Sequence, residues 1–395
     1  MTDRAKLILA PGKEKAVMRR HPWIFSGAVR KRVGKPEAGD LVDVLGSDGQ
    51  WLAVGHFQED SIICKVLSFE SEVVDESFWR ERLRQAVEYR RRLGFFDEQQ
   101  MEHTNVFRLV NGEGDYLPGL IADYYHGVVV LQAHSVGMHR MFGLLTELLK
   151  EVLGKDVVSV FDKSKATLPG GGSEDGYLWG EEPEEWEIVE DDNRMLINFY
   201  EGQKTGFFVD QRENRHLVGT VSGGKKVLNC FGYTGGFSLG ALRGGAAYVE
   251  TVDISKKAIE LCDRNVAMNF PEGKHKGVVA DVLKYLDTVS DQFDVIILDP
   301  PAFAKNHRNL QQGLKGYRNI NQKAMEKIRP GGLLFTFSCS QAVSKEDFQT
   351  MAFTAAANAK RKVRIVRQLP HAMDHPVSIF HPEGEYLKGL LLYVE

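Results

Sequence analysis

The spacing of apolar and polar residues divides the chain into three regions with different predicted structures. The first, residues 1–70, contains strand-like apolar runs at 40–45, 51–57 and 61–69. The sequence Gly-Ser-Asp-Gly at 46–49 has the composition of a hairpin turn between the first two runs. We therefore expect residues 1–70 to form a small β-barrel.

The second region, residues 71–185, combines two periodicities. Apolar residues recur at helical spacing over 72–93 and 138–153, which predicts two amphipathic helices. The stretch 169–183 is rich in Gly, Pro and acidic residues and is predicted to be a loop. Continuous apolar runs predict strands at 107–110, 119–133 and 157–161. Together these elements indicate a small α+β domain in the middle of the chain.

The third region, residues 186–395, begins with a hairpin-like pair of runs at 186–190 and 194–200 and then alternates between strands and helices. The predicted strands are 227–230, 248–252, 277–279, 294–298 and 333–337. The predicted helices are 237–243, 256–268, 282–286 and 317–328. Such alternation implies a parallel sheet with helices on both faces. The fold class is therefore α/β, with a Rossmann-like domain in the C-terminal half.

Composition narrows the class of protein. The chain has 395 residues, 43% of them hydrophobic, so we expect two or three folded domains. Its net charge of −4 gives no argument, over the whole chain, for binding to nucleic acid. Lys and Arg are nevertheless concentrated in the first 35 residues and over 80–92. Such local asymmetry permits a basic binding face on a mildly acidic protein.

Cysteine content and hydropathy indicate the compartment. The four cysteines lie far apart in the sequence, so the spacing predicts neither a zinc site nor a disulfide framework, and we expect no metal. No apolar run approaches the ~20 residues of a membrane span, and the N-terminal run is too short for a signal peptide. We expect a soluble cytoplasmic protein that does not bind membranes.

A glycine-rich turn follows the first strand of the predicted C-terminal sheet. Its glycines allow the backbone to bend sharply and approach a ligand, and the helix after it presents its N-terminal amides. The spacing differs from the G-x-G-x-x-G of dinucleotide-binding enzymes, which disfavours a nicotinamide cofactor. The turn residues that we expect at a cofactor are Asn229, Phe231, Gly232, Tyr233, Thr234 and Gly235.

Two acidic residues end the next two predicted strands. Asp253 is placed where a carboxylate can accept hydrogen bonds from both hydroxyls of a ribose. Asp281 ends the third strand, where an acidic side chain can meet the amino group of an adenine. Ligands of such sheets bind just outside the carboxyl ends of the strands. With their neighbours Ile254, Ser255 and Val282, these residues predict an S-adenosylmethionine site.

Two further strand ends carry candidate chemistry. Asp299, expected both at the base and at the cofactor, precedes two prolines that stop sheet pairing and fix the backbone. They present its carboxylate or its carbonyl to an extruded base. Cys339 ends the fifth strand between two serines. Methylation at C5 of a pyrimidine requires a nucleophile that adds to C6, and a thiolate can serve, whereas an exocyclic amine requires none. Cys339 and Asp299 are therefore the predicted catalytic residues.

At these residues the sequence resembles the class I S-adenosylmethionine-dependent rRNA large subunit methyltransferase I family, which forms 5-methylcytosine. The sequence HPWIFSG at 21–27 is similar to the start of that family's PUA domain, an RNA-binding β-barrel. The segment 111–120 is similar to its central domain, and 203–212 to the segment beside its cofactor. The resemblance covers nearly the whole chain. The domains that it implies are 1–70 (PUA), 71–185 (central α+β) and 186–395 (methyltransferase).

The resemblance also implies roles for individual residues. It makes Cys339 the nucleophile and Asp299 the acid that holds the base, and it adds Lys204, Phe208 and Asp210 to the cofactor site. Many other RNA cytosine-5 methyltransferases carry a second cysteine after the Asp-x-Pro, but Ala302 follows the prolines here. The sequence therefore does not identify the group that removes the C5 proton.

The implied partner is large-subunit ribosomal RNA, and the sequence also allows a homodimer. The basic N-terminal stretch and the predicted loop at 305–318 are expected to contact the RNA, because Lys and Arg bind its phosphates. The residues expected to make these contacts are Arg19, Arg20, Trp23, Lys305, Lys315, Tyr317 and Arg318.

Two other functions stay open at this stage. The sequence Asp-Pro-Pro-Ala-Phe at 299–303 also resembles the motif of enzymes that methylate a nitrogen of guanine or adenine, although Cys339 argues against that reaction. The second alternative is a non-catalytic RNA-binding factor in ribosome assembly that retains a methyltransferase fold. The intact glycine turn, both cofactor acids and the thiol argue against it.

Overall fold

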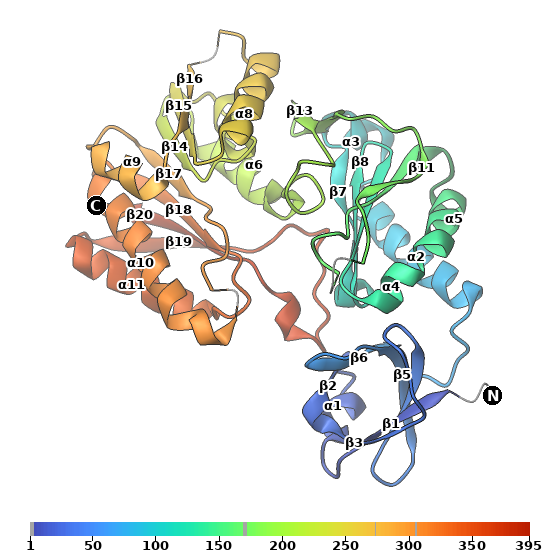
Figure 1. Ribbon diagram of the computed structural model, residues 1–395. Coiled ribbons are helices and arrows are strands. Elements are labelled where there is room, and N and C mark those ends of the chain that lie inside the picture. The colour runs from blue at the N-terminus through green and yellow to red at the C-terminus, as the bar shows by residue number, and fades with distance from the viewer. Residues whose placement is uncertain (1–3, 169–171, 273, 305) are drawn as a thin grey trace. The chain divides into compact units, whose positions relative to one another are not determined.

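A computed structural model of the chain describes residues 4–168, 172–272, 274–304 and 306–395. It divides into two compact units, each built from more than one stretch of the sequence (Figure 1). The first unit comprises Met1–Ile188, Ile197–Val209 and Met373–Gly384. The second comprises Val189–Leu196, Asp210–Ala372 and Glu385–Glu395. A late segment of the chain, Met373–Gly384, thus belongs to the first unit.

The N-terminal part of the first unit is a six-stranded sheet with the order β2-β6-β5-β4-β1-β3. Its elements are β1 (Ala5–Leu9), α1 (Glu14–Met18), β2 (Trp23–Phe25), β3 (Val29–Val33), β4 (Leu41–Leu45), β5 (Trp51–Phe57) and β6 (Ile62–Ser68). Leu7, Leu9, Val42 and Val44 pack in a core of its own. The three predicted strands are present. Strands β1, β2 and β3 were not predicted. Strand β2 is only three residues long, and β3 is mostly polar and exposed.

A second sheet in the same unit has the order β11-β10-β9-β8-β7. Its strands are β7 (Val106–Asn111), β8 (Leu120–Tyr125), β9 (Val128–Ala133), β10 (Ser159–Asp162) and β11 (Gly176–Gly180), and its helices are α2 (Glu76–Arg92), α3 (Glu98–His103), α4 (Val136–Arg140) and α5 (Phe142–Leu153). The predicted strand 119–133 is two strands, because His126 and Gly127 reverse the chain with positive φ. The predicted loop 169–183 contains β11, which pairs with β10.

Helix α2 shows how local sequence and distant partners combine. Its N-terminus is capped by Asp75, which accepts a hydrogen bond of 3.1 Å from the amide of Phe78. Its apolar side faces the core of the central sheet, as the periodicity predicted. Arg90, however, is fully buried and forms a bidentate ion pair of 2.5 and 2.8 Å with Asp115. This arginine of the basic stretch 80–92 is therefore structural and does not form part of a binding face.

The second unit contains a seven-stranded sheet with the order β16-β15-β14-β17-β18-β20-β19. The strands are β14 (Lys226–Cys230), β15 (Tyr248–Asp253), β16 (His275–Val279), β17 (Val295–Leu298), β18 (Gly332–Ser338), β19 (Val363–Leu369) and β20 (Lys388–Val394). Strands β14 to β18 run parallel, and β20 is antiparallel to both of its neighbours. Strands β15 and β16 are added on one side of β14, and β17 and β18 on the other. The carboxyl ends of β14 and β17 therefore lie at a topological switch point, where such sheets bind ligands.

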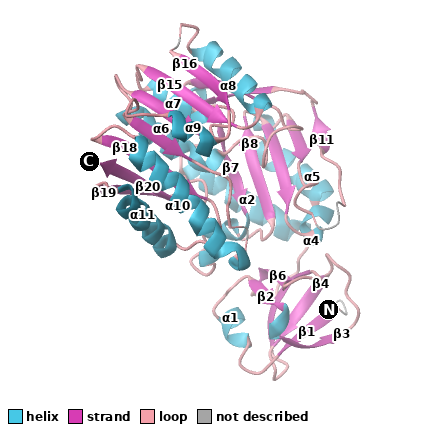
Figure 2. Ribbon diagram, turned by 60° about the vertical axis from the view of Figure 1, so that its left-hand side comes forward, coloured by secondary structure: helices cyan, strands magenta, loops and turns pink. Residues whose placement is uncertain are grey.

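Helices cover both faces of this sheet (Figure 2). They are α6 (Arg212–Val221), α7 (Gly236–Arg243), α8 (Lys256–Asn269), α9 (Val282–Thr288), α10 (Leu310–Lys327) and α11 (Lys345–Ala359). Helices α9, α10 and α11 share one apolar core with the strands. Helix α10 begins at Leu310, seven residues before the predicted start at Tyr317, so part of the predicted loop 305–318 is helical. The short strands β12 (Trp186–Glu190) and β13 (Asn193–Ile197) precede the sheet as a pair.

The described residues lack both a membrane-spanning helix and a metal-binding cluster. None of their helices combines the length and the apolar character that a membrane span requires. Within the same residues, no three His, Cys, Asp or Glu side chains are grouped so that they could hold a metal ion.

Candidate active site

The glycine turn connects β14 to α7 and has a tightly constrained backbone. Phe231 and Tyr233 have positive φ angles of 59° and 47°, a conformation that is costly for residues with large side chains. A Cβ atom on Gly232 would lie 2.2 Å from the side chain of Thr251, so this position accepts only glycine without rearrangement. Strain of this kind is found where the backbone must approach a ligand.

Asp253, at the end of β15, is bound to the turn. Its Oδ2 accepts a hydrogen bond of 3.0 Å from the amide of Tyr233, and its Oδ1 accepts one of 2.9 Å from the amide of Ser255. A carboxylate has about four acceptor positions, so two remain for a diol. The neighbouring Ile254 is 73% exposed, which is unusual for a large apolar side chain beside a buried sheet.

Asp281 lies two residues after the end of β16 and is the N-cap residue of helix α9. Its side chain caps that helix by accepting a hydrogen bond of 3.0 Å from the amide of Lys284, so the role of a helix cap is fulfilled. The residue is exposed, whereas Val282 after it is buried. Capping occupies one carboxylate oxygen and leaves acceptor capacity for an amino group.

Side-chain hydrogen bonds connect Asn229 of the turn to α7 and β15. The Asn229 amide donates to Ser238 Oγ at 2.9 Å, and this hydroxyl is 2.6 Å from Thr251 Oγ1. Among the described residues, the buried oxygens Asn229 Oδ1 and Thr234 Oγ1 have no hydrogen-bond partner. Buried polar atoms are nearly always satisfied. The site therefore fits a polar nucleoside ligand such as S-adenosylmethionine. It offers two unpartnered oxygens, a turn at Gly232 with no room for a side chain, and carboxylates at the strand ends.

The candidate catalytic residues end the neighbouring strands β17 and β18. Asp299 follows β17 and is half-buried, Pro300 is buried and Pro301 is exposed. Cys339 follows β18 and is also half-buried. Since β17 and β18 are parallel neighbours with Leu298 opposite Thr336, both residues lie at the ligand edge of the sheet.

Tyr317 and Ser340 tie these two strand ends together. The hydroxyl of Tyr317 is 2.8 Å from Ser340 Oγ and accepts a hydrogen bond of 3.3 Å from the amide of Phe303. Ser340 Oγ accepts one of 3.2 Å from the amide of Ala304. The segment after Asp-Pro-Pro is thus held against the residue that follows Cys339. Burial raises the pKa of Tyr317, which keeps its hydroxyl protonated.

The four cysteines differ in accessibility. Cys64, Cys230 and Cys262 are completely buried, and burial raises the pKa of each of these thiols, that of Cys262 to about 12. They are therefore inert at neutral pH. Cys339 is the one cysteine of the four that reaches the surface.

Three predicted cofactor residues lie in the segment before α6. Asp210 belongs to the second unit, where it is buried and its Oδ2 accepts a hydrogen bond of 2.7 Å from the hydroxyl of Tyr386. Lys204 and Phe208 belong to the first unit, with the ammonium of Lys204 4.5 Å from the centre of the Phe208 ring. Cofactor contact by these three residues stays a prediction.

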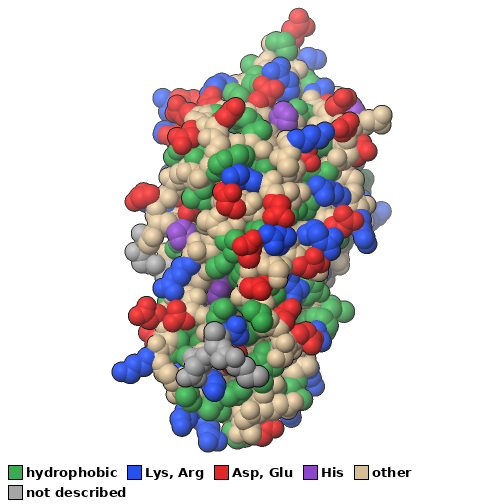
Figure 3. Space-filling model, turned by 90° about the vertical axis from the view of Figure 1, so that its right-hand side faces the viewer, with side chains coloured by type: hydrophobic (Ala, Val, Ile, Leu, Met, Phe, Trp, Pro, Cys, Tyr) green, Lys and Arg blue, Asp and Glu red, His purple; other side chains and the backbone are tan. Residues whose placement is uncertain are grey.

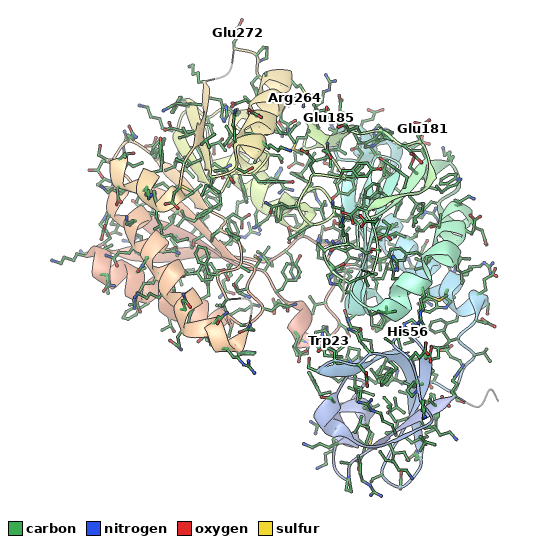
Figure 4. The ribbon with its side chains drawn as sticks, in the orientation of Figure 1. Trp23, His56, Glu181, Glu185, Arg264 and Glu272 are labelled. Atoms are coloured by element: carbon green, nitrogen blue, oxygen red, sulfur yellow. The ribbon has the colours of Figure 1, made fainter. Side chains whose placement is uncertain are left out.

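The residues predicted to contact RNA in the first unit have different surroundings. Arg19 is exposed, and Arg20 forms an exposed ion pair of 2.9 Å with Glu70. Trp23, labelled in Figure 4, is half-buried. Its indole N–H donates a hydrogen bond of 2.7 Å to Glu113 of the central region. Figure 3 shows acidic and basic side chains interspersed on the face that it presents. The two arginines therefore remain candidates for phosphate contacts, while Trp23 also has a structural role.

Of the RNA contacts predicted in the second unit, the one at Tyr317 is wrong. Lys315 is exposed and Arg318 is half-buried on α10, so both remain candidates. Tyr317 does not fit the predicted contact, because its side chain is completely buried in the core. Its position on the inner side of α10 explains the difference. Lys305 lies outside the described residues.

One residue near the site was missed at the sequence level. Lys388 is 5% exposed at the start of β20, and its ammonium donates a hydrogen bond of 2.6 Å to the carbonyl of Ser340. An isolated lysine in the sequence carries no signal that it is buried, so this contact could not be predicted.

Comparison with known proteins agrees with this arrangement. Residues 168–377 match the family described as S-adenosylmethionine-dependent methyltransferase, and residues 7–69 match the PUA-like domain. A crystal structure described as a methyltransferase complexed with SAH has a TM-score of 0.86, covers 98% of this chain and 100% of its own, and is 21% identical. That likeness shows a shared fold and confirms the predicted fold class.

Curated relatives extend over the whole chain. The ribosomal RNA large subunit methyltransferase I of Shewanella denitrificans is 39% identical over 98% of this chain and 99% of its own length. The protein of the same name from Escherichia coli is 38% identical over 97% and 98%. The chain uses S-adenosylmethionine as its cofactor, as the domain match indicates. It belongs to the ribosomal RNA large subunit methyltransferase I family of S-adenosylmethionine-dependent methyltransferases.

Proposed function

We propose that this protein methylates C5 of a cytidine in large-subunit ribosomal RNA, with Cys339 as the nucleophile. The substrate class follows from the name shared by the full-length relatives. The reaction follows from one observation: of the four cysteines, the one at the ligand edge of the sheet is the one that is accessible. A nitrogen methyltransferase has no use for a thiol at that position, because an exocyclic amine already carries a nucleophilic lone pair.

When bound, S-adenosylmethionine supplies an electrophilic methyl group on a sulfonium. The chain binds it through the backbone of the glycine turn and through Asp253 and Asp281, whose carboxylates accept hydrogen bonds from the ribose and the adenine. Ile254, exposed beside Asp253, offers an apolar surface to the adenine ring. We also assign Lys204, Phe208 and Asp210 to this site.

Cys339 makes the first bond to the cytosine. Its thiolate forms a bond from Sγ to C6 of the cytosine, and the electron pair of the C5–C6 double bond moves to C5. That carbon takes the methyl group, and the sulfonium leaves as a neutral thioether. Loss of the proton from C5 to a base restores the double bond and breaks the bond from Sγ to C6, which returns the thiolate.

Asp299 holds the base in place for this attack. The two prolines after it fix the backbone, so its carboxylate can accept a hydrogen bond from the N4 amino group, the donor that distinguishes cytosine. The contacts of Tyr317 and Ser340 hold the two strand ends at a constant separation. We assign phosphate binding to Arg19, Arg20, Lys315 and Arg318.

The decisive experiment compares wild type with Cys339→Ala and Cys339→Ser on large-subunit ribosomal RNA. Mass spectrometry of the nucleosides should show 5-methylcytidine with wild type and none with either variant, since a hydroxyl is far less nucleophilic than a thiolate. Wild type should also form a covalent complex with RNA that contains 5-fluorocytidine, because the fluorine blocks proton loss from C5. Cys64→Ala, at a buried cysteine of the N-terminal sheet, is the matched control and should retain activity.

The same measurement decides between the alternatives. If Cys339→Ala retains most of its activity and the product is a methylated guanine or adenine, the reaction is nitrogen methylation without an adduct. If no nucleoside is methylated although S-adenosylmethionine binds, the protein is an assembly factor.

A further inference from the structure

Lys388 is a buried cation close to the proposed nucleophile. Its side chain is 5% exposed, and lysine is almost never buried without a partner for its charge. Among the described residues, no carboxylate lies within ion-pair distance of its nitrogen. The ammonium instead donates hydrogen bonds of 2.6 Å to the carbonyl of Ser340 and 2.7 Å to that of Tyr386. Two carbonyl acceptors favour the protonated form of the lysine.

The sheet topology places this ammonium at the ligand edge. Strand β20 is antiparallel to β18, and Lys388, its first residue, pairs with Ser338, the last residue of β18. The start of an antiparallel strand lies at the same edge as the ends of the parallel strands. Cys339 lies between Ser338, which pairs with Lys388, and Ser340, whose carbonyl Lys388 binds. The backbone of Lys388 is thus paired with the residue before the cysteine, and its ammonium binds the carbonyl of the residue after it.

The charges around Lys388 act in both directions. Burial lowers the pKa of Lys388 to about 8. The negative charges of Cys339 and Glu385 raise this pKa, and the positive charge of Lys345 on α11 lowers it further. Since Glu385 and Lys345 are partnered with each other, the thiolate of Cys339 is the principal negative charge that Lys388 faces. An interaction between two titrating groups is mutual, so the cation must favour the thiolate as much as the thiolate favours the cation.

We propose that Lys388 is a positioning residue whose ammonium holds Cys339 in its thiolate form, which rests on the proposed role of Cys339 as the nucleophile. The proton of the thiol leaves to solvent, and at neutral pH Lys388 keeps its own proton, because pH 7 lies below its pKa of about 8. The carbonyls of Ser340 and Tyr386 fix its nitrogen, so the charge is in place before the RNA binds. The role extends the site to a strand that begins 49 residues after the cysteine.

The test measures the thiol and requires no RNA. Wild type and Lys388→Met, both as full-length protein, are treated with iodoacetamide between pH 5.5 and 10, and alkylation of Cys339 is followed by peptide mass spectrometry. The three buried cysteines should stay unmodified. In wild type the midpoint of the pH profile should fall below 8.5, the ordinary value for cysteine. In Lys388→Met it should rise by about one pH unit, with alkylation at pH 7 slowed by about tenfold.

Two further variants separate charge from structure. Lys388→Arg keeps the cation and should retain most of the low midpoint, which a role in packing alone would not explain. Lys362→Met removes an exposed lysine at the opposite end of the β19–β20 pair and should leave the profile unchanged. If Lys388→Met fails to fold, the wild-type profile still decides, since a midpoint at or above 8.5 contradicts the proposal. Coincident profiles of wild type and a folded Lys388→Met also overturn it.

The outcomes also distinguish this inference from the proposed function. Loss of methylation in Cys339→Ala, together with an unchanged thiol profile in Lys388→Met, supports the function and overturns the role of Lys388. Retained methylation in Cys339→Ala overturns the function whatever the thiol profile shows.

Discussion

The hydroxyl groups of Tyr317 and Ser340 lie 2.8 Å apart and connect the two strand ends that carry the proposed chemistry. Through the amides of Phe303 and Ala304 they also hold the segment after Asp-Pro-Pro. The distance between the carboxylate of Asp299 and the thiol of Cys339 therefore depends on a buried contact that involves neither residue.

Replacing Tyr317 with Phe should slow methylation several-fold and leave S-adenosylmethionine affinity unchanged. The variant loses the acceptor for the amide of Phe303, at a cost of about 1 kcal/mol in the free energy of unfolding, and loosens the spacing of the two strand ends. Steady-state kinetics and calorimetry measure the two effects. Tyr393→Phe, on β20, is the control. An unchanged kcat in Tyr317→Phe would show that the contact serves stability alone.

Asp253→Ala should weaken S-adenosylmethionine binding by roughly 1.5–3 kcal/mol, the contribution of hydrogen bonds to a charged group. The side chain also orients the turn by accepting from the amide of Tyr233. Isothermal calorimetry on the full chain measures the loss. Asp287→Ala, on α9, removes an ion pair with Lys323 of α10 and should bind as wild type does. Equal affinities of wild type and Asp253→Ala would remove Asp253 from the site.

Gly232→Ala should abolish detectable cofactor binding at concentrations that saturate wild type. The added methyl group would lie 2.2 Å from Thr251 Cγ2, so the turn must move. Gly223→Ala is a matched control, since its Cβ would meet its nearest neighbour at 3.5 Å, an ordinary contact. Circular dichroism confirms that each variant is folded. Normal binding by a folded Gly232→Ala would mean that the cofactor does not depend on this turn.

Reversing the charge of Arg19 and Arg20 together should weaken RNA binding and reduce its dependence on salt, while cofactor affinity stays constant. Each phosphate contact contributes about one unit to the slope of log affinity against log salt for duplexes, and about 0.7 for single strands. Filter binding at several salt concentrations gives that slope. Lys155→Glu, at an exposed lysine of the central region, controls for overall charge. If the double variant and wild type show the same slope of log affinity against log salt, the RNA does not contact these two arginines.

The first unit should lose stability as the pH falls from 6.5 towards 4. Burial lowers the pKa of His56 and of His134 to about 4, so each binds a proton more readily when unfolded, and protonation favours the unfolded state. By pH 5 each histidine should cost about 2 kcal/mol. Trp79, stacked on His56 at 5.9 Å, reports unfolding by its fluorescence.

The variant His56→Leu should remove about half of this pH dependence, because it cannot bind the proton. The variant His103→Leu, at an exposed histidine of the same unit, should keep the wild-type dependence. If His56→Leu also keeps it, the loss of stability at low pH arises from other groups.

Local sequence was sufficient for the elements that form the proposed cofactor site. The apolar runs of β14, β15 and β17 are continuous because both faces of a parallel strand are buried, and the glycines and acids that follow them mark the strand ends. The turn 229–236, Asp253 and Asp299 could therefore be placed at one edge of the sheet. Each of these signals extends over fewer than ten residues and depends on no distant partner.

The remaining features depend on contacts between residues that are far apart in the chain. Helix α10 begins at Leu310 with a polar stretch in which Gly313 lies close against Ala304, and Tyr317 on the same helix is buried. Arg90 and Lys388 resemble surface residues until Asp115 and the carbonyl of Ser340 accept their charged groups. Burial of a polar side chain is favourable only when its partners are already in place. Those partners are brought together by the folded chain, so no local pattern reveals them.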